Sequence, residues 1–167
     1  MNKKIFLVGP MGSGKSTIGR LLAKRLELPH YDLDAIIEKE QGKTISEIFE
    51  EYNEEHFRNL ESKVLMEYSM LDEFIVSTGG GTILRKDNQK IFKIGCVVYL
   101  RISLQTQYIR IKNRSHRPLL ENKNIKTTIK KLDNIRGEIY QKVSNIEVDV
   151  SNLTKEDVVS NIINKLN

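Results

Sequence analysis

A glycine-rich loop near the start of the chain carries the residues with the clearest chemistry. Residues 9–17 read Gly-Pro-Met-Gly-Ser-Gly-Lys-Ser-Thr, the spacing of loops that hold the phosphates of a nucleoside triphosphate. In such loops, backbone N–H groups and a helix N-terminus surround the phosphates. Lys15 adds charge between the β- and γ-phosphates, and the Ser16 hydroxyl can bind Mg²⁺. The expected phosphate-binding residues are Gly12, Ser13, Gly14, Lys15, Ser16 and Thr17.

The residues on either side of this loop support that interpretation. An apolar, β-branched run at 5–8 precedes the loop, as expected of a buried strand. After it, apolar residues recur at helical spacing at Ile18, Leu21, Leu22 and Leu26. The order strand, glycine loop, helix predicts a nucleotide site here, against the alternative of a glycine-rich turn without a ligand.

Two acids follow the second expected strand. Asp32 and Asp34 are two residues apart, so a strand end would place both on one side. One carboxylate could then lie near Mg²⁺ and the other near an acceptor hydroxyl. The alternative is that Asp34 only caps the helix that begins after it.

An arginine and a glutamate lie three residues apart on an expected helix. Arg58 and Glu61 therefore share a face, and the glutamate can hold the arginine in one orientation for an anion. A surface ion pair is the alternative. Gly79, Gly80 and Gly81 follow the third expected strand, where their bare backbone would admit a close substrate.

Strand and helix patterns alternate along the chain. The expected strands are 4–8, 29–32, 74–78, 96–100 and 145–149. The expected helices are 15–27, 34–41, 46–51, 54–70, 86–94, 104–113, 125–143 and 155–166. This alternation predicts a mostly parallel sheet covered on both faces by helices, with ligands at the carboxyl ends of its strands. The region around Arg101, after the fourth strand, belongs to that expected edge.

Size and composition indicate one soluble domain. The chain has 167 residues, a net charge of +5 and one cysteine, Cys96. No apolar run approaches the roughly 20 residues that span a bilayer, and a single cysteine forms no disulfide framework, so a cytoplasmic protein is expected. The positive charge suits an enzyme with two anionic substrates. The alternative, nucleic-acid binding through the lysines of 123–131, would require salt-sensitive affinity for oligonucleotides.

Missing motifs narrow the class of nucleotide-binding protein. The chain contains no Asn-Lys-x-Asp and no Asp-x-x-Gly, and the third expected strand ends without an acid. A GTPase switch is therefore not expected.

Taken in order, the motifs resemble those of the shikimate kinase family over the whole chain. They are the phosphate loop, Asp32-x-Asp34, Phe57-Arg58-x-x-Glu61, Gly79-Gly80-Gly81, Arg117-Pro118-Leu119-Leu120, and Arg136 four residues before Tyr140. The resemblance implies a three-layer α/β P-loop kinase fold with a five-stranded parallel sheet in the order 2-3-1-4-5. It implies one domain over 1–167, with a substrate-binding region at about 33–61 and a mobile lid at about 112–124. The implied reaction is phosphorylation of the 3-hydroxyl of shikimate by ATP, on the route to chorismate and the aromatic amino acids.

The resemblance also implies a role for each matching residue. Lys15, Asp34 and Arg117 would be catalytic, with Lys15 and Arg117 neutralising the transferred phosphoryl group and Asp34 orienting the attacking hydroxyl. The shikimate-binding residues would be Asp34, Arg58, Gly79, Gly80, Gly81 and Arg136, with Glu61 supporting Arg58. Arg110 and Arg117 would flank ATP. Ser16 and Asp32 would hold one Mg²⁺, Asp32 through water. A monomer without nucleic-acid or membrane partners is expected.

Two positions depart from the family pattern. Asn53 precedes Glu54 where many members have glycine, and asparagine tolerates the left-handed backbone that such a turn can need. Near Leu153 the basic or glycine residue of many members is missing, so adenine contacts there would be backbone and packing. Two other functions remain open: another small-molecule kinase of this fold, such as a gluconate kinase, and a non-catalytic nucleotide-binding regulatory module.

Overall fold

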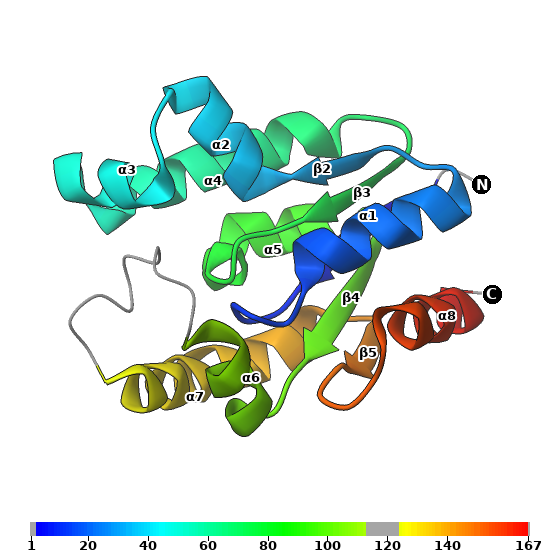
Figure 1. Ribbon diagram of the computed structural model, residues 1–167. Coiled ribbons are helices and arrows are strands. Elements are labelled where there is room, and N and C mark those ends of the chain that lie inside the picture. Colours follow the sequence, from blue (N-terminus) through cyan, green and yellow to red (C-terminus); the bar gives the residue numbers. More distant parts are fainter. Residues whose placement is uncertain (1–2, 113–123, 167) are drawn as a thin grey trace.

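The computed structural model describes residues 3–112 and 124–166 of the chain. Its strands are β1 (Lys4–Val8), β2 (His30–Asp32), β3 (Phe74–Ser77), β4 (Cys96–Arg101) and β5 (Ile146–Asp149). Its helices are α1 (Lys15–Leu26), α2 (Leu33–Gln41), α3 (Ile45–Glu51), α4 (Glu54–Ser69), the 3₁₀-helix η1 (Thr82–Leu84), α5 (Lys86–Phe92), α6 (Leu104–Ile111), α7 (Ile125–Val143) and α8 (Lys155–Leu166). Figure 1 shows their arrangement.

The strands form one parallel sheet in the order β2-β3-β1-β4-β5. The expected order is confirmed. In the register, Leu7 of β1 lies between Ser77 of β3 and Val98 of β4. Parallel pairing brings the carboxyl ends of all five strands to one edge of the sheet, and the phosphate loop leaves β1 at this edge (Figure 1).

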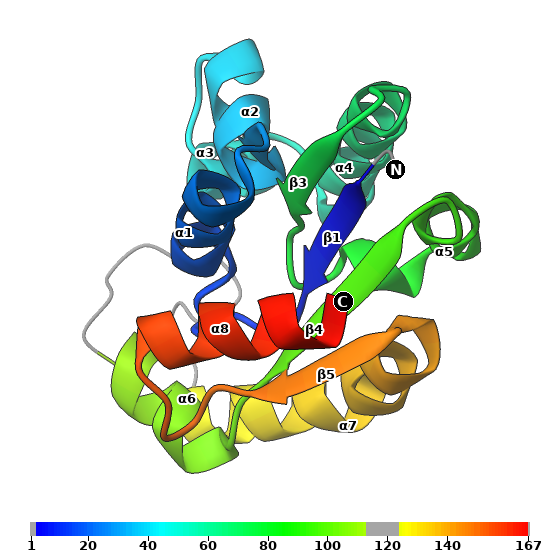
Figure 2. The same cartoon turned by 90° about the vertical axis from the view of Figure 1, so that its right-hand side faces the viewer.

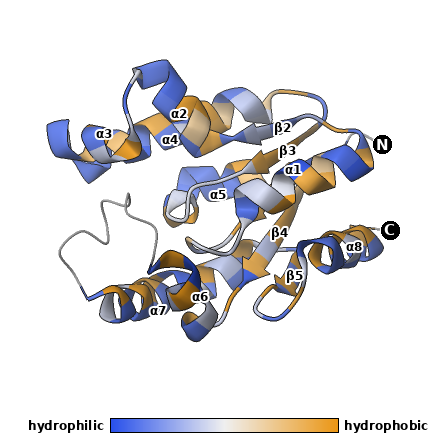
Figure 3. Cartoon of the chain, in the orientation of Figure 1, coloured by the Kyte–Doolittle hydropathy of each residue, from blue (hydrophilic) through white to orange (hydrophobic). Residues whose placement is uncertain are grey.

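Alternating side chains along each strand build two separate cores. Phe6 and Val8 of β1 join a cluster with residues of α2, α4, α5 and α7, whereas Ile5 and Leu7 join a cluster with α1 and α8. In Figure 2, α1 and α8 accordingly lie on one side of the sheet, and α4 and α5 on the other. In Figure 3, β3 and β4 are largely hydrophobic, whereas the helices carry both hydrophobic and hydrophilic residues. The three-layer architecture is confirmed.

Element boundaries agree with the expected ones to within a few residues, because capping residues mark them. Thr44 and Glu47 form a reciprocal capping box at the start of α3. At α4 the Asn53 side chain accepts a hydrogen bond of 2.8 Å from the His56 N–H. Asn53 has a φ of −139°, so the left-handed turn considered from its residue type is not formed. An N-cap asparagine with extended backbone starts the helix instead.

None of the helices in the described ranges is long and apolar enough to cross a membrane.

Candidate active site

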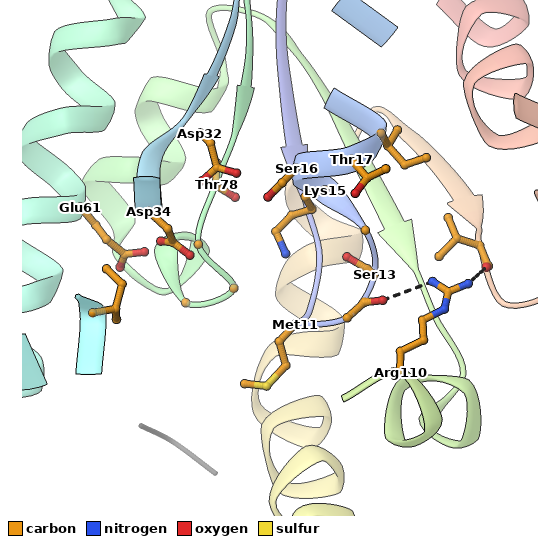
Figure 4. A pocket seen from close by; sticks show the side chains of 18 of the residues that line it. Met11, Ser13, Lys15, Ser16, Thr17, Asp32, Asp34, Glu61, Thr78 and Arg110 are labelled. Atoms are coloured by element: carbon orange, nitrogen blue, oxygen red, sulfur yellow. Dashed lines mark hydrogen bonds between the residues drawn. The ribbon is translucent and has the colours of Figure 1, made fainter. Parts of the chain in front are cut away.

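One cavity of about 1110 Å³ lies at the carboxyl edge of the sheet. Residues from the phosphate loop, the ends of β2 and β3, and helices α2, α3, α4, α6, α7 and α8 line it. Figure 4 shows Asp34 and Glu61 on one side of Lys15, and Arg110 on the other. The cavity therefore has an end near the acids and arginines of α2, α4 and α7, and an end bordered by α6 and α8.

The phosphate loop has the backbone that its motif requires. Gly14 is the N-cap of α1 with a φ of 95°, a left-handed conformation that glycine adopts without strain. The Lys15 ammonium donates to the carbonyl oxygens of Gly9 and Pro10, at 2.8 and 3.1 Å, which holds it across the loop. The loop and the helix N-terminus behind it thus have the geometry of an anion site.

Asp32 is the residue that caps α2. Its Oδ1 accepts a hydrogen bond of 3.3 Å from the Ala35 N–H, whereas Asp34 lies in the first turn of the helix. The alternative in which Asp34 is the cap is therefore wrong, because the helix begins one residue earlier than its pattern suggested. Both carboxylates line the cavity.

Arg58 and Glu61 form a buried ion pair between Nη1 and Oε2. Their side chains are 9% and 1% exposed, so the alternative of a surface pair is wrong. Glu54 also binds the guanidinium, accepting from Nε at 3.3 Å and from Nη2 at 3.0 Å. Burial by itself would lower the pKa of Arg58, but Glu61 and Glu54 together raise that pKa above its ordinary value. Arg58 therefore remains a fixed cation at the cavity wall.

The glycine run makes room for the charged side chains of the chain itself. A Cβ atom at Gly79 would lie 2.2 Å from Glu61 Oε1, and one at Gly81 would lie 2.4 Å from Arg58 Nη2. The hydroxyl of Thr82, just after the run, donates a hydrogen bond of 2.7 Å to the same Glu61 Oε1. The loop after β3 therefore packs its bare backbone directly against the buried ion pair.

Arg136 lies on the same wall from α7. Arg136 is 5% exposed, and among the described residues its buried Nε has no hydrogen-bond partner. A Cβ atom at Gly80 would lie 3.4 Å from Arg136 Nη1. Two arginines thus approach consecutive glycines of one loop, which gives this end of the cavity the charge and donors to bind a carboxylate.

Arg110 lies beneath the other end of the cavity. Its guanidinium donates a hydrogen bond of 3.2 Å to the carbonyl oxygen of Gly12 and one of 2.9 Å to that of Val150. Figure 4 draws both bonds. Arg110 therefore ties the phosphate loop to the segment after β5. Val150, Leu153 and Val158 line the cavity there and supply an apolar surface of the kind that an adenine ring needs.

Comparison with known proteins decides the family. The family model for shikimate kinase matches residues 11–167. This chain belongs to the shikimate kinase family. It is 40% identical to a shikimate kinase of Legionella pneumophila over 165 residues, covering 98% of this chain and 94% of the relative. It is 42% identical to one of Thioalkalivibrio sulfidiphilus over 159 residues, covering 95% and 84%.

Solved structures agree with this assignment. A shikimate kinase of Acinetobacter baumannii in complex with shikimate superimposes with a TM-score of 0.94 at 36% identity, covering 97% of this chain and 91% of that one. A gluconokinase of Sinorhizobium meliloti matches with a TM-score of 0.64 at 20% identity, which shows a shared fold only.

The structure places most of the residues expected from the kinase motifs around this one cavity. The lining includes residues 12–17, both aspartates, Arg58, Glu61, residues 79–81, Arg110 and Arg136. Arg101, expected at the same edge, is not among the lining residues. It pairs instead with Glu147 and Asp149 of β5, each at 2.7 Å. Arg117 and most of the expected lid, residues 113–123, lie outside the described residues.

Three residues that contact the cavity wall are not predicted for the site from the sequence: Glu54, Thr82 and Tyr140. Glu54 is not among the residues predicted for the site, although its place one turn before Arg58 is the spacing of a second ion pair. Thr82 had no signal beyond following the glycine run, and the hydroxyl of Tyr140 had none beyond its spacing from Arg136. The hydrogen bonds of Thr82 and Tyr140 join elements far apart in sequence, which spacing alone cannot reveal.

Proposed function

We propose that this protein transfers the γ-phosphoryl group of ATP to the 3-hydroxyl of shikimate, producing shikimate 3-phosphate and ADP. This reaction is a step toward chorismate and the aromatic amino acids. The observation that carries the proposal is the buried Arg58–Glu61 pair facing, with Arg136, the same cavity as the phosphate loop. Arginine binds planar carboxylates at two points, and shikimate is a cyclic carboxylate.

The hydrogen bonds of Arg58 support its role in this proposal. A guanidinium has five N–H groups. Glu54 and Glu61 take three of them, through Nε, Nη2 and Nη1. These bonds leave one N–H on Nη1 and one on Nη2 for the two oxygens of a substrate carboxylate. The two glutamates therefore orient the arginine without exhausting its donors.

The acceptor hydroxyl would be positioned by Asp34 and the glycine loop. Asp34 lines the cavity beside Gly79, whose Cβ would lie 3.1 Å from the aspartate Oδ1. In the proposed reaction, Asp34 accepts the hydrogen bond of the 3-hydroxyl and takes up its proton. The N–H of Gly80 and the backbone of Gly79 and Gly81 contact the substrate.

Phosphoryl transfer depends on positioning and charge neutralisation more than on covalent chemistry. Lys15 would leave the carbonyl oxygens of Gly9 and Pro10 for the phosphate oxygens, which are stronger acceptors. Arg110 would flank the nucleotide. We propose that Arg117 adds a further positive charge to the phosphoryl group, and that the lid at about 112–124 closes to exclude water.

The donor atoms near the phosphate loop fit Mg²⁺. Mg²⁺ prefers oxygen ligands and commonly combines few protein groups with phosphates and waters. Ser16 and Asp32 offer a hydroxyl and a carboxylate at the cavity, and no larger His, Cys, Asp or Glu cluster occurs within 3–112 and 124–166. We propose that Ser16 binds the metal directly and Asp32 through water. The bound ion would neutralise charge on the phosphates.

All the proposed contacts come from one chain, so we propose that the single domain acts as a monomer in the cytoplasm, without nucleic-acid or membrane partners. Light scattering during gel filtration should then give a mass near 19.3 kDa, the mass of one chain. A dimer mass would contradict this part of the proposal without affecting the reaction.

A coupled assay of ADP release with Mg·ATP tests the reaction. The acceptors to compare are shikimate, gluconate, a nucleoside monophosphate and no acceptor. We expect release that depends on shikimate alone. Arg58→Ala should raise the KM for shikimate and leave the KM for ATP nearly unchanged. Arg85→Ala is a suitable control, because Arg85 also pairs with α4, through Glu55, but is not among the residues that line the cavity.

Other outcomes of the same assay would overturn the proposal in distinct ways. Release with gluconate and not shikimate would keep the fold and the phosphate loop but reject the carboxylate site. Absence of release with every acceptor would support a nucleotide-binding regulatory module.

A further inference from the structure

Tyr140 lies one turn after Arg136 on the same face of α7. Its side chain is 1% exposed, and its hydroxyl donates a hydrogen bond to the carbonyl oxygen of Gly80. This bond joins the C-terminal half of α7 to the glycine loop after β3, two elements 60 residues apart in sequence. A buried tyrosine hydroxyl usually has a hydrogen-bond partner, and here the partner is the backbone of the cavity wall.

The Tyr140 ring is itself held in place. It stacks on Tyr99 of β4, with ring centroids 5.0 Å apart and an interplanar angle of 16°. Burial raises the pKa of Tyr140 above its ordinary value and raises that of Tyr99 to about 12. The Tyr140 hydroxyl is therefore protonated at neutral pH and remains a donor. Tyr99 lies on β4, which is paired on both sides by β1 and β5, and gives the Tyr140 ring a rigid support.

Gly80 is in contact with both residues of the α7 face. A Cβ atom there would lie 3.4 Å from Arg136 Nη1 and 3.6 Å from the Tyr140 hydroxyl. The described residues contain no cis peptide bond, so the N–H of Gly81 points opposite to the Gly80 carbonyl and away from Tyr140. The backbone of Gly81 in turn packs against the Arg58 guanidinium, which lies where a Cβ atom of residue 81 would be. One peptide unit thus lies between the two arginines, and Tyr140 fixes its orientation.

We propose that Tyr140 is a positioning residue for the acceptor pocket. By holding the Gly80–Gly81 peptide against Arg136, it sets the separation of Arg136 and Arg58 and aims the glycine backbone at the substrate. This inference rests on the proposed function, since the acceptor is taken to be shikimate. Tyr140 touches no reacting atom and acts through Gly80 and Arg136, both of which its hydroxyl contacts.

Tyr140→Phe tests the inference because it removes one oxygen and retains the stacked ring. The Gly80 carbonyl would lose its partner, and the loop would no longer be held in one orientation. We expect the KM for shikimate to rise about 5- to 30-fold, on the scale of one lost buried hydrogen bond. The kcat and the KM for ATP should stay within about twofold of the wild type. A residue with only a packing role would instead leave both KM values unchanged.

Tyr99→Phe is the matched control. It removes a hydroxyl from the other ring of the same stack, one that is not bonded to the glycine loop. We expect its kinetic constants to remain within about twofold of the wild type. An equal rise in the KM for shikimate in both variants would overturn the proposal, because the effect would then follow from the stack and not from the Gly80 bond.

A second variant covers the case in which Tyr140→Phe does not fold. Tyr99→Leu removes the support of the ring but leaves the Tyr140 hydroxyl, and it should raise the KM for shikimate by about 2- to 5-fold at an unchanged KM for ATP. An unchanged KM for shikimate in the folded variant would overturn the proposal. The wild-type assay separates the two hypotheses: without shikimate-dependent ADP release the proposed function itself fails, whatever Tyr140 does.

Discussion

The hydroxyl of Ser77 at the end of β3 donates a hydrogen bond of 3.0 Å to the carbonyl oxygen of Lys15. His30 of β2 places Nε2 at 2.9 Å from the same hydroxyl. Because the Ser77 hydroxyl donates its hydrogen to the Lys15 carbonyl oxygen, it accepts a hydrogen bond from His30 Nε2. Gly19 of α1 leaves space for this arrangement, because a Cβ there would lie 2.3 Å from the ring nitrogen. The sheet thus supports the backbone of the phosphate loop from behind.

Ser77→Ala should therefore weaken ATP binding and leave shikimate binding alone. Losing the bond frees the first turn of α1, and we expect the KM for ATP to rise roughly 2- to 10-fold, on the scale of one hydrogen bond. The KM for shikimate should stay within about twofold. Ser69→Ala is the control, because Ser69 is also a buried serine that donates to a backbone carbonyl, that of Met66 in α4. Equal effects of the two variants on ATP would contradict the support by Ser77.

The two glutamates on Arg58 should differ sharply in their contributions. Glu61→Gln leaves a buried arginine without its buried partner, which should lower the free energy of unfolding by roughly 3–5 kcal/mol. Glu54 is 53% exposed on its side chain, so Glu54→Gln should cost about 0–1 kcal/mol. Urea denaturation followed by circular dichroism measures both. Similar losses in the two variants would show that burial does not set the strength of these pairs.

Sequence reasoning succeeds here where one element carries the whole signal. The backbone of the phosphate loop follows from its motif, and the pairing of Arg58 with Glu61 follows from helical spacing. The sheet order, which involves all five strands, came from the resemblance to the family. The pattern at 32–34 does not show which aspartate caps α2, because a shift of one residue in the start of the helix changes the cap. Contacts between distant elements, such as those of Thr82 with Glu61 and of Tyr140 with Gly80, also leave no signal in the spacing. The glycine run was explained by a substrate, although Glu61 and Arg58 already occupy the space beside it.

Gly79→Ala should be severely damaging. The added methyl group would lie 2.2 Å from Glu61 Oε1 and would push that carboxylate away from Arg58 and Thr82. Overpacking of this kind costs roughly 1–3 kcal/mol, and we expect shikimate-dependent turnover to fall by more than tenfold. Assays of turnover and thermal unfolding check both expectations.

Gly137→Ala is the control for Gly79→Ala, because it makes the same substitution where the added methyl group has space. Gly137 lies within α7, where a Cβ would have Asp133 Oδ1 as its nearest neighbour at 3.5 Å. Alanine stabilises a helix interior by roughly 0.5–1 kcal/mol relative to glycine, so this variant should unfold at a higher temperature. Its turnover should be retained. Normal turnover in Gly79→Ala would mean that the loop can move without disturbing the arginine.

Asp32→Asn tests the proposed role of Asp32 in binding Mg²⁺ separately from its role as the N-cap of α2. Asparagine caps helices about as well as aspartate, so α2 should begin at the same residue. Loss of the charge at the helix N-terminus should change the free energy of unfolding by at most about 1 kcal/mol. The Mg²⁺ concentration for half-maximal activity should nevertheless rise about 10- to 100-fold, the usual effect of altering a residue that orients bound metal. Titration of activity with Mg²⁺ after EDTA treatment measures this shift.

Asp87→Asn, at an exposed aspartate that also lies near a helix N-terminus but pairs with Lys90, should leave the titration unchanged. If Asp34→Asn shifted the Mg²⁺ titration and Asp32→Asn did not, the roles proposed for the two aspartates would have to be exchanged.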